Sequence, residues 1–248
     1  VSLVYFICYI GTMSTDKQAK INQLLKILPH GVAITSLWLT RQGYSLDLQK
    51  RYRKSGWLES IGTGAMKRSG EKLTLEGGIY ALQKQLNLSV HPGGKTALSM
   101  QGSSHYLQFS TSKTHLFGPA RQTLPKWFKD YAWESPILYH TNNLFSSDVG
   151  MAEVQLQSFE IKVSNSARAL MECLYLYPES QDLSECLEIM ESLNNLRPDT
   201  VSTLLESCSS VKVNRLFVYL AEKTGHNWFK YLKLENVDFG KGKRSLAK

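Results

Sequence analysis

Residues 45–68 read SLDLQKRYRKSGWLESIGTGAMKR, and this stretch decides the fold of the N-terminal part of the chain. Ser45 is a preferred helix N-cap residue, and the helix that it begins is expected to end near Lys54. Positions at helical spacing form one face of this helix: Leu48, Tyr52 and Ser55. The residues after it are predicted to form two short strands around the turn Gly62-Thr63-Gly64, because glycine accepts the backbone of a tight turn.

Two further helices are predicted before this stretch. Thr15 and Gln18 form a capping-box pattern, and the apolar positions after them repeat with the period of a helix: Ile21, Leu24, Leu25 and Leu28. A second helix is expected over about residues 35–42, with Gly43 as the turn residue. Three helices followed by a hairpin is the order of a winged helix, whose third helix enters a DNA groove.

The positive charge of the chain lies almost entirely in this region. Residues 14–72 hold eleven Lys or Arg and four Asp or Glu, and the whole 248-residue chain has a net charge of +8. Cations concentrated on a helix and hairpin that fit a groove are typical of a nucleic-acid-binding protein. Two alternatives remain, a solvated basic helix face and a winged helix that contacts only proteins.

We therefore predict that this region binds double-stranded DNA through the third helix and the return strand of the hairpin. The cations of the helix would face the groove, and those of the return strand would reach a phosphate or the minor groove. The predicted DNA-binding residues are Ser45, Asp47, Gln49, Lys50, Arg51, Arg53, Lys54, Lys67 and Arg68.

The rest of the chain is predicted to be an α+β domain over residues 73–248, after a winged helix over 14–72. A helix is expected around 77–86, a short strand at 88–91, and a helix after the turn at Gly93 and Gly94. Further strands are expected at 105–109, 114–117, 137–141 and 153–163, with Leu124–Phe128 as an exposed turn into an aromatic anchor. Helices are expected from Ser164 and over 179–193, 198–206 and 211–224.

Charge also divides this second region. Residues 150–210 hold three basic and ten acidic groups, whereas residues 211–248 hold nine basic and three acidic groups. The basic tail is expected to pack on the acidic block, with a second nucleic-acid contact as the alternative. A non-catalytic interaction module that uses the acidic block 179–206 as a docking surface is a further alternative for the function.

Enzymatic readings have weaker support, and neither a cofactor nor a metal is predicted. Gly94-Lys95-Thr96 resembles the end of a phosphate-binding loop, but Ser89 stands where that motif needs a glycine. Glu160 and Lys162 form the E-x-K tripeptide of restriction-type nucleases, which also needs an aspartate such as Asp130 or Asp148. A metal-dependent nuclease with a DNA-binding head is therefore the alternative, and we expect no catalysis.

The termini and cysteines bear on the compartment. Cys8, Cys173, Cys186 and Cys208 show no CxxC spacing, which favours a reducing cytoplasm over a disulfide framework. Residues 1–12 read VSLVYFICYIGT, without the charged start of a signal peptide. We expect residues 1–13 to be an apolar leader, either an upstream extension with Met13 as the biological start or an additional strand or interface segment. No stretch reaches the roughly 20 apolar residues of a membrane span.

Several motifs in order make the chain similar to a known family. After the winged helix come GGIYALQKQL, VHPGGKTAL with QGSSHYL, LPKWF, FEIKVSNSARALMECLYL and the tail GKRSLAK. From about Thr15 to Lys248 this order resembles the AbiEi antitoxins of the AbiE phage-resistance toxin–antitoxin systems. The matched positions are Gly93, Gly94, Lys95, Thr96, Ala97, Leu98, Gly102, His105, Pro125, Trp127, Ser164, Ala167, Arg168 and Ala169.

The resemblance implies an antitoxin that represses its own promoter by binding inverted repeats through the winged helix. It also implies that the C-terminal domain counteracts a nucleotidyltransferase-like toxin, either with or without a stable complex. On this basis Lys95, Thr96 and Arg168 are predicted to serve the antitoxin function. Arg168 is expected to face outward near a helix start, with a surface ion pair to Glu172 as the structural alternative. Similar proteins usually continue beyond GKRSLAK, so the chain is expected to be shortened there.

Overall fold

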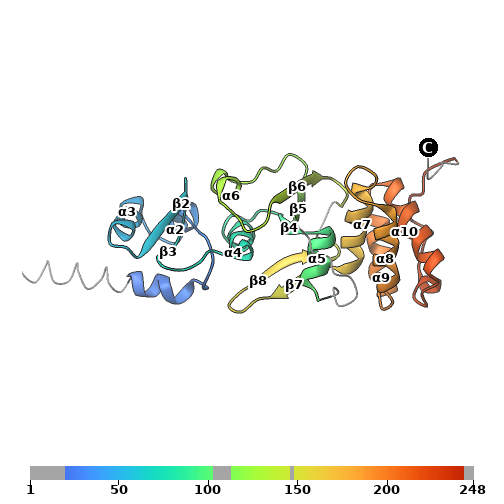
Figure 1. The fold of residues 1–248 in the computed structure, drawn as a ribbon, viewed down its shortest axis with the longest axis horizontal. Coiled ribbons are helices and arrows are strands. Elements are labelled where there is room, and N and C mark those ends of the chain that lie inside the picture. Colours follow the sequence, from blue (N-terminus) through green and yellow to red (C-terminus); the bar gives the residue numbers. More distant parts are fainter. Residues whose placement is uncertain (1–19, 103–112, 146–147, 243–248) are drawn as a thin grey trace, which may run out of the picture. The chain divides into compact units, whose positions relative to one another are not determined.

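The computed structural model describes residues 20–102, 113–145 and 148–242, which form two compact units (Figure 1). The first unit comprises Val1–Leu88, Leu124–Ala132 and Leu156–Phe159. The second comprises Ser89–Thr123, Trp133–Gln155 and Glu160–Lys248. The predicted leader, the capping box at Thr15 and the strand at 105–109 lie outside the described residues.

The first unit contains the predicted winged helix. A helix runs through residues 20–27, and after it come α2 (Ser36–Arg41), α3 (Leu46–Lys54), β2 (Leu58–Gly62) and β3 (Ala65–Arg68). β1 (Ile34–Thr35), which was not predicted, pairs antiparallel with β3 and gives the sheet the order β1-β3-β2. The α+β class and the winged helix are confirmed.

The core of the winged helix follows the apolar periodicity of the sequence. Ile21, Leu24 and Leu28 are buried, and Leu25 packs against them from a partly buried position. Leu48 and Tyr52 of α3 complete this core from the opposite side. The helix face that the spacing predicted to be buried is therefore buried, which leaves the other face of α3 to solvent.

Two further elements pack on the winged helix within this unit. They are α4 (Leu75–Tyr80) and the π-helical turn η1 (Ala81–Gln85). A side chain at Gly77 would lie 1.9 Å from the Gly31 carbonyl oxygen, so this contact requires glycine. The predicted domain boundary after residue 72 would separate α4 and η1 from the winged helix. The compact unit instead continues to Leu88 and contains both elements. The division of function between the two predicted domains stays a prediction.

The second unit is built on small sheets. β4 (His91–Pro92), β5 (Thr114–Pro119) and β6 (Ile137–Asn142) form a sheet of that order, in which β5 and β6 are parallel. β7 (Met151–Gln155) and β8 (Glu160–Ser164) form an antiparallel hairpin. The single strand expected over 153–163 is therefore wrong, because the chain reverses between Gln155 and Glu160.

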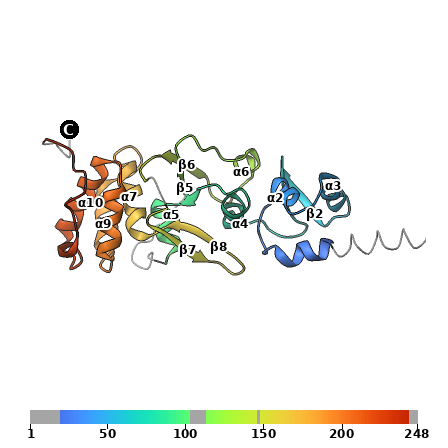
Figure 2. The ribbon, with the colours of Figure 1, turned by 180° about the vertical axis from the view of Figure 1, so that it is seen from behind.

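Helices make up the remainder of the second unit. α5 (Gly94–Met100) packs against α7 (Ser166–Leu176), and α8 (Leu183–Ser192) and α10 (Val211–Thr224) also pack on α7. α9 (Pro198–Ser207) and the 3-10 turn η3 (Phe229–Tyr231) complete this part, and α7 to α10 lie side by side in both views (Figure 1 and Figure 2). Nowhere in the described ranges is a helix both long and apolar enough to cross a membrane.

Two local predictions need correction. The helix expected to begin at Ser164 begins at Ser166, because the Asn165 side chain accepts a hydrogen bond from the Arg168 amide and caps it. The segment expected as an exposed turn forms α6 (Lys126–Asp130) in the first unit, where Trp127 and Phe128 are buried.

Candidate nucleic-acid interface

α3 has the caps and charge order of a stable surface helix. The Ser45 hydroxyl accepts a hydrogen bond from the Leu48 amide at 3.3 Å, as the sequence predicted. Asp47 lies in the first turn, whereas Arg51, Arg53 and Lys54 lie in the last turn. The acidic residue thus lies at the positive end of the helix dipole and the three cations lie at its negative end, which stabilises the helix. The same order gathers these cations at one end of the helix.

The face of α3 opposite the core is exposed and cationic. Lys50, Arg51, Arg53 and Lys54 are all exposed, and so is Asp47. Within the described residues, none of these five side chains has a hydrogen-bond or ion-pair partner. Their charges are therefore open to a ligand, as direct readout or phosphate binding would require.

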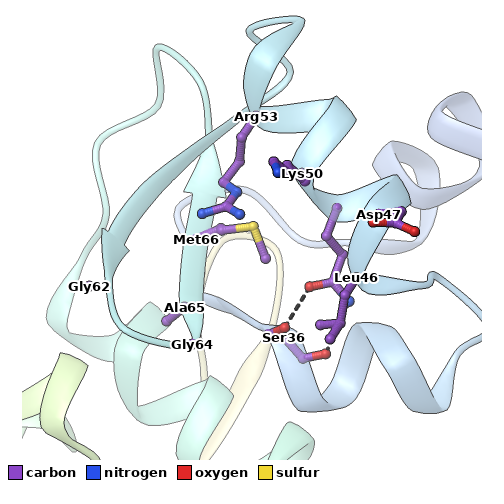
Figure 3. A pocket seen from close by; sticks show the side chains of 10 residues that line it. Ser36, Leu46, Asp47, Lys50, Arg53, Gly62, Gly64, Ala65 and Met66 are labelled. Atoms are coloured by element: carbon purple, nitrogen blue, oxygen red, sulfur yellow. Dashed lines mark hydrogen bonds between the residues drawn. The ribbon is translucent and has the colours of Figure 1, made fainter.

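A hollow of about 320 Å³ separates α3 from the wing (Figure 3). Arg53 extends from α3 toward Met66 of β3, and Lys50 lies one helical turn before it (Figure 3). Leu46, Ala65 and Met66 contribute apolar surface, and the exposed fraction of Leu46 is 67%. The lining of the hollow thus combines apolar surface with the cationic side chains of Lys50 and Arg53.

Gln49 does not belong to the exposed face, so its predicted role as a direct DNA contact stays a prediction that its burial weakens. Its exposed fraction is 2%. Its Oε1 accepts a hydrogen bond from the Ser36 hydroxyl at 2.6 Å, and its Nε2 donates to the Tyr44 carbonyl at 2.8 Å. Nε2 also lies 3.2 Å from the Thr40 hydroxyl. Gln49 therefore joins α3 to α2 inside the winged helix.

The two predicted cations of the wing are also held by the fold. Arg68 donates hydrogen bonds to the carbonyls of Leu25 and Leu28, at the end of the first helix, and lies 3.4 Å from Glu71. A cation stabilises a helix C-terminus by binding its last carbonyl groups, so these contacts favour a structural role for Arg68. Its predicted DNA contact stays a prediction, and these partners weaken it.

Lys67 is restrained in a similar way. Its Nζ donates to the Glu71 carbonyl at 2.9 Å and lies 3.4 Å from a carboxylate oxygen of Glu59 on β2. The exposed fraction of its side chain is 18%. Its predicted phosphate contact stays a prediction, and these partners weaken it.

In the second unit, buried polar groups surround Glu172 of α7, whose exposed fraction is 1%. Its carboxylate accepts hydrogen bonds from His91 Nε2, the Gly94 amide and the Ser164 hydroxyl at 2.8–3.0 Å. It also accepts one from Arg168 Nε at 3.1 Å. We call these residues the Glu172 cluster.

Charge balance explains the ionised state of this cluster. Burial raises the pKa of Glu172, but the hydrogen bond from His91 and the positive charge of Arg168 outweigh it, and the pKa lies below its ordinary value. In the sequence, only the spacing of Arg168 and Glu172 indicates this cluster. No local pattern indicates that His91, 81 residues before Glu172, would bond to it, nor that Ser164, a matched position at the end of β8, would do so.

The prediction that Arg168 faces outward is wrong. Arg168 is buried, and besides Glu172 its guanidinium donates to the Val149 carbonyl at 2.7 Å and stacks 4.6 Å from the Phe145 ring centroid. The surface ion pair considered as an alternative is wrong as well, because the pair with Glu172 is buried.

The cluster also explains the matched glycines of the HPGGK motif. A Cβ atom at Gly93 would lie 2.2 Å from a Glu172 oxygen and 2.4 Å from the Phe117 ring. The Gly94 amide is already bonded to Glu172 and has a φ of +53°. This turn therefore holds a carboxylate of its own chain where a phosphate-binding loop would hold a ligand.

Lys95 and Thr96, the other predicted antitoxin residues, also have partners. The Thr96 hydroxyl accepts a hydrogen bond from the His115 amide at 2.9 Å. Lys95 Nζ lies 3.0 Å from Glu185 of α8, and 20% of its side chain is exposed. Thr96 is buried, so its surroundings favour a structural role, whereas an antitoxin role for Lys95 stays a prediction.

A histidine pair that the sequence did not reveal lies on the parallel strands. His115 Nδ1 is 3.1 Å from His140 Nε2, and the two rings stack with centroids 5.2 Å apart. Burial lowers the pKa of His115 to about 4, with smaller contributions from the charges of His140, Lys95 and Lys113. The pair is therefore neutral at neutral pH.

The residues of the nuclease alternative are only partly brought together. Lys162 Nζ lies 2.9 Å from Asp148, so the cation of the E-x-K tripeptide is paired with one of the candidate aspartates. Glu160 lies on β8 opposite Gln155 of β7. Among the residues that the structure describes, no three His, Cys, Asp or Glu side chains are arranged to hold a metal ion.

Comparison with known proteins identifies the family. Residues 17–109 match the family model of the "Transcriptional regulator, AbiEi antitoxin N-terminal domain". Residues 111–248 match the model of the "Transcriptional regulator, AbiEi antitoxin, Type IV TA system". No curated protein sequence matches the chain.

Among solved structures, the RV2827C protein from Mycobacterium tuberculosis has a similar fold, with a TM-score of 0.50 and 14% sequence identity. The similarity covers 84% of this chain and 77% of that protein. From the two family models, which together span the winged helix and the second unit, the chain belongs to the AbiEi antitoxin family of transcriptional regulators of type IV toxin–antitoxin systems.

Proposed function

We propose that this protein represses its own promoter by binding inverted repeats in double-stranded DNA through α3 and the wing. The observation that carries the proposal is the exposed face of α3, where Lys50, Arg51, Arg53 and Lys54 have no partner among the described residues. Unpaired cations on the solvent-exposed face of a helix suit a major groove flanked by phosphates.

The hollow between α3 and the wing supports this arrangement. A guanidinium binds a phosphate through two hydrogen bonds, and Arg53 lies at the edge of the hollow. The apolar surface of Leu46 and Met66 suits contact with a deoxyribose or a thymine methyl group. Ser45, Asp47 and Lys50 are then the candidates for contacts near the start of the helix.

Promoter binding is tested by fluorescence anisotropy with a labelled duplex from upstream of the gene. Lys50→Ala and Arg51→Ala are each expected to weaken binding by about 1–3 kcal/mol if the side chain reads a base edge. The matched control is Lys223→Ala, which removes an exposed lysine of α10 in the second unit. If both α3 variants bind as tightly as the parent, the interface is assigned to the wrong face.

For the second unit we propose the antitoxin activity, directed against a nucleotidyltransferase-like toxin of the same operon in the cytoplasm. The family match over residues 111–248 supports this assignment. An Arg51→Ala full-length protein, expressed from an unrelated promoter, is expected to rescue cells from the toxin while failing to repress its own promoter. Loss of rescue in this variant would mean that DNA binding and neutralisation are not separable.

We further propose that the protein acts without catalysis. The pairing of Lys162 with Asp148 supports this, because a nuclease lysine must be available to the attacking water. Purified protein with Mg²⁺ or Mn²⁺ should leave plasmid DNA intact. Cleavage that disappears in Glu160→Ala and Lys162→Ala would instead establish the nuclease alternative.

A further inference from the structure

The wing is packed against a helix that comes from a distant part of the sequence. α6 belongs to the first unit, although more than fifty residues separate it from the wing. A Cβ atom at Gly62, the last residue of β2, would lie 3.0 Å from Trp127 Cβ and 3.1 Å from Trp127 Cα. The backbone of α6 therefore lies directly beside the wing turn.

α6 has one buried and one exposed face. Trp127 and Phe128 are buried and form an edge-to-face pair with centroids 5.5 Å apart. Lys126 and Lys129 are three residues apart, so both lie on the opposite face of the helix, and both are exposed. In the part of the chain that the structure describes, neither ammonium group has a hydrogen-bond or ion-pair partner.

The wing itself offers little charge to a ligand. Its turn, Gly62-Thr63-Gly64, is exposed and uncharged. Between Leu58 and Arg68 the only cations are Lys67 and Arg68, which bind Glu71, Glu59 and the carbonyls of the first helix. The unpartnered lysines next to the turn are those of α6.

We propose that α6 is part of the DNA interface, and that Lys126 and Lys129 bind the phosphate backbone beside the wing turn. This inference rests on the proposed DNA binding by α3. The ligand is the duplex flank next to the base pairs that α3 contacts, and the contact is independent of sequence because it involves phosphates alone. Trp127 and Phe128 are buried and anchor the helix that bears the two lysines.

The test is the salt dependence of promoter binding by the full-length protein. Each phosphate contact contributes a slope of about −0.9 to the plot of log K against log salt. We expect Lys126→Gln and Lys129→Gln each to reduce the slope by about this amount, and the double variant by about twice as much. Hydroxyl-radical footprinting should show that the double variant loses protection at the outer flank while it keeps the centre of each repeat.

Two controls make the result specific. Asp130→Asn removes an exposed negative charge from the same helix and should tighten binding, which is the opposite sign. Lys223→Gln, in the second unit, should leave the slope unchanged. Thermal unfolding of every variant should match the parent, because all four side chains are exposed.

The outcomes separate this inference from the proposed function. If Lys50→Ala weakens binding but the double variant keeps the slope and footprint of the parent, α6 is not in the interface and the binding by α3 stands. If the parent has no affinity for the promoter duplex, both the proposed DNA binding by α3 and the contact through α6 are wrong. Reduced slopes with a shortened footprint establish α6 as a DNA contact.

Discussion

α3 and α7 both have arginines among their charged residues, and the two helices use them in opposite ways. Arg51 and Arg53 of α3 are exposed and have no partner in the described residues. Arg168 of α7 is buried and bonded to Glu172 and to the Val149 carbonyl. Residue type alone therefore does not separate a binding residue from a structural one. Burial and partners do.

This difference has a physical origin. A buried charge must be compensated by its own fold, because transfer from water to the interior is unfavourable by several kcal/mol for each ion. An exposed charge needs no partner, and its interaction with a phosphate gains from the release of counterions. Substitutions in the Glu172 cluster should thus change stability, whereas substitutions on α3 should change DNA affinity.

The largest effect is expected for Glu172→Gln. The substitution keeps the shape of the side chain but leaves Arg168 as a buried charge without its counterion. We expect the free energy of unfolding to fall by about 3–5 kcal/mol in urea denaturation. The matched control is Glu188→Gln on the exposed side of α8, which should stay within about 0.5 kcal/mol of the parent.

Two outcomes would contradict the structural role of the Glu172 cluster. One is a Glu172→Gln protein as stable as the parent. The other is a correctly folded Glu172→Gln protein that has lost promoter affinity, because the cluster would then also control the DNA-binding surface.

The next effect is a loss of stability in mild acid caused by His115. In the unfolded chain this imidazole binds a proton near its ordinary pKa of 6.5, whereas in the folded protein it does so only at about 4. The unfolded state therefore binds more protons between these values, and the stability falls as the pH is lowered from 6.5 to 4. The full loss is about 3 kcal/mol, and above pH 7 the group contributes nothing.

This pH dependence is measured by urea denaturation at several pH values. His115→Gln should flatten the curve between pH 6.5 and 5, before the carboxylates begin to titrate. A curve for the variant that is parallel to that of the parent would show that His115 is not the group responsible.

A smaller effect on stability, but a diagnostic one for DNA binding, is expected for Gln49→Leu. The substitution leaves the Ser36 hydroxyl and the Tyr44 carbonyl without their buried partner, which should lower stability by about 1–3 kcal/mol. Because Gln49 sets the position of α3 on α2, promoter affinity should fall with no change in preference at any one base pair. Loss of preference for adenine at a single position would restore Gln49 as a direct contact.

The local features of the winged helix were predictable from the sequence. The cap at Ser45, the buried face of Leu48 and Tyr52 and the turn at Gly62-Thr63-Gly64 each depend on residues a few positions apart, and periodicity reports such features. The predicted interface therefore contained all four of the α3 cations that the structure exposes.

The sequence did not predict the contacts in which a side chain meets a distant partner. Arg68 caps a helix that lies about forty residues earlier, and α6 reaches the wing from a still greater distance. Strand β1 is two residues long and exists only through its pairing with β3. Such contacts leave no local pattern, so exposed and buried cations look alike in the sequence.

The smallest effect is expected for Lys67→Gln, and it tests the boundary between the two classes of cation. Lys67 lies on the wing, yet its ammonium group is held by the Glu71 carbonyl and the Glu59 carboxylate. This ammonium group must lose these two interactions before it can contact a phosphate, so a phosphate contact would add little affinity. We expect a change of less than about 0.5 kcal/mol in promoter affinity and no change in the salt slope. A slope reduced by about 0.9 would show that DNA competes successfully with Glu59 for this lysine. The wing would then provide a phosphate contact of its own beside α6.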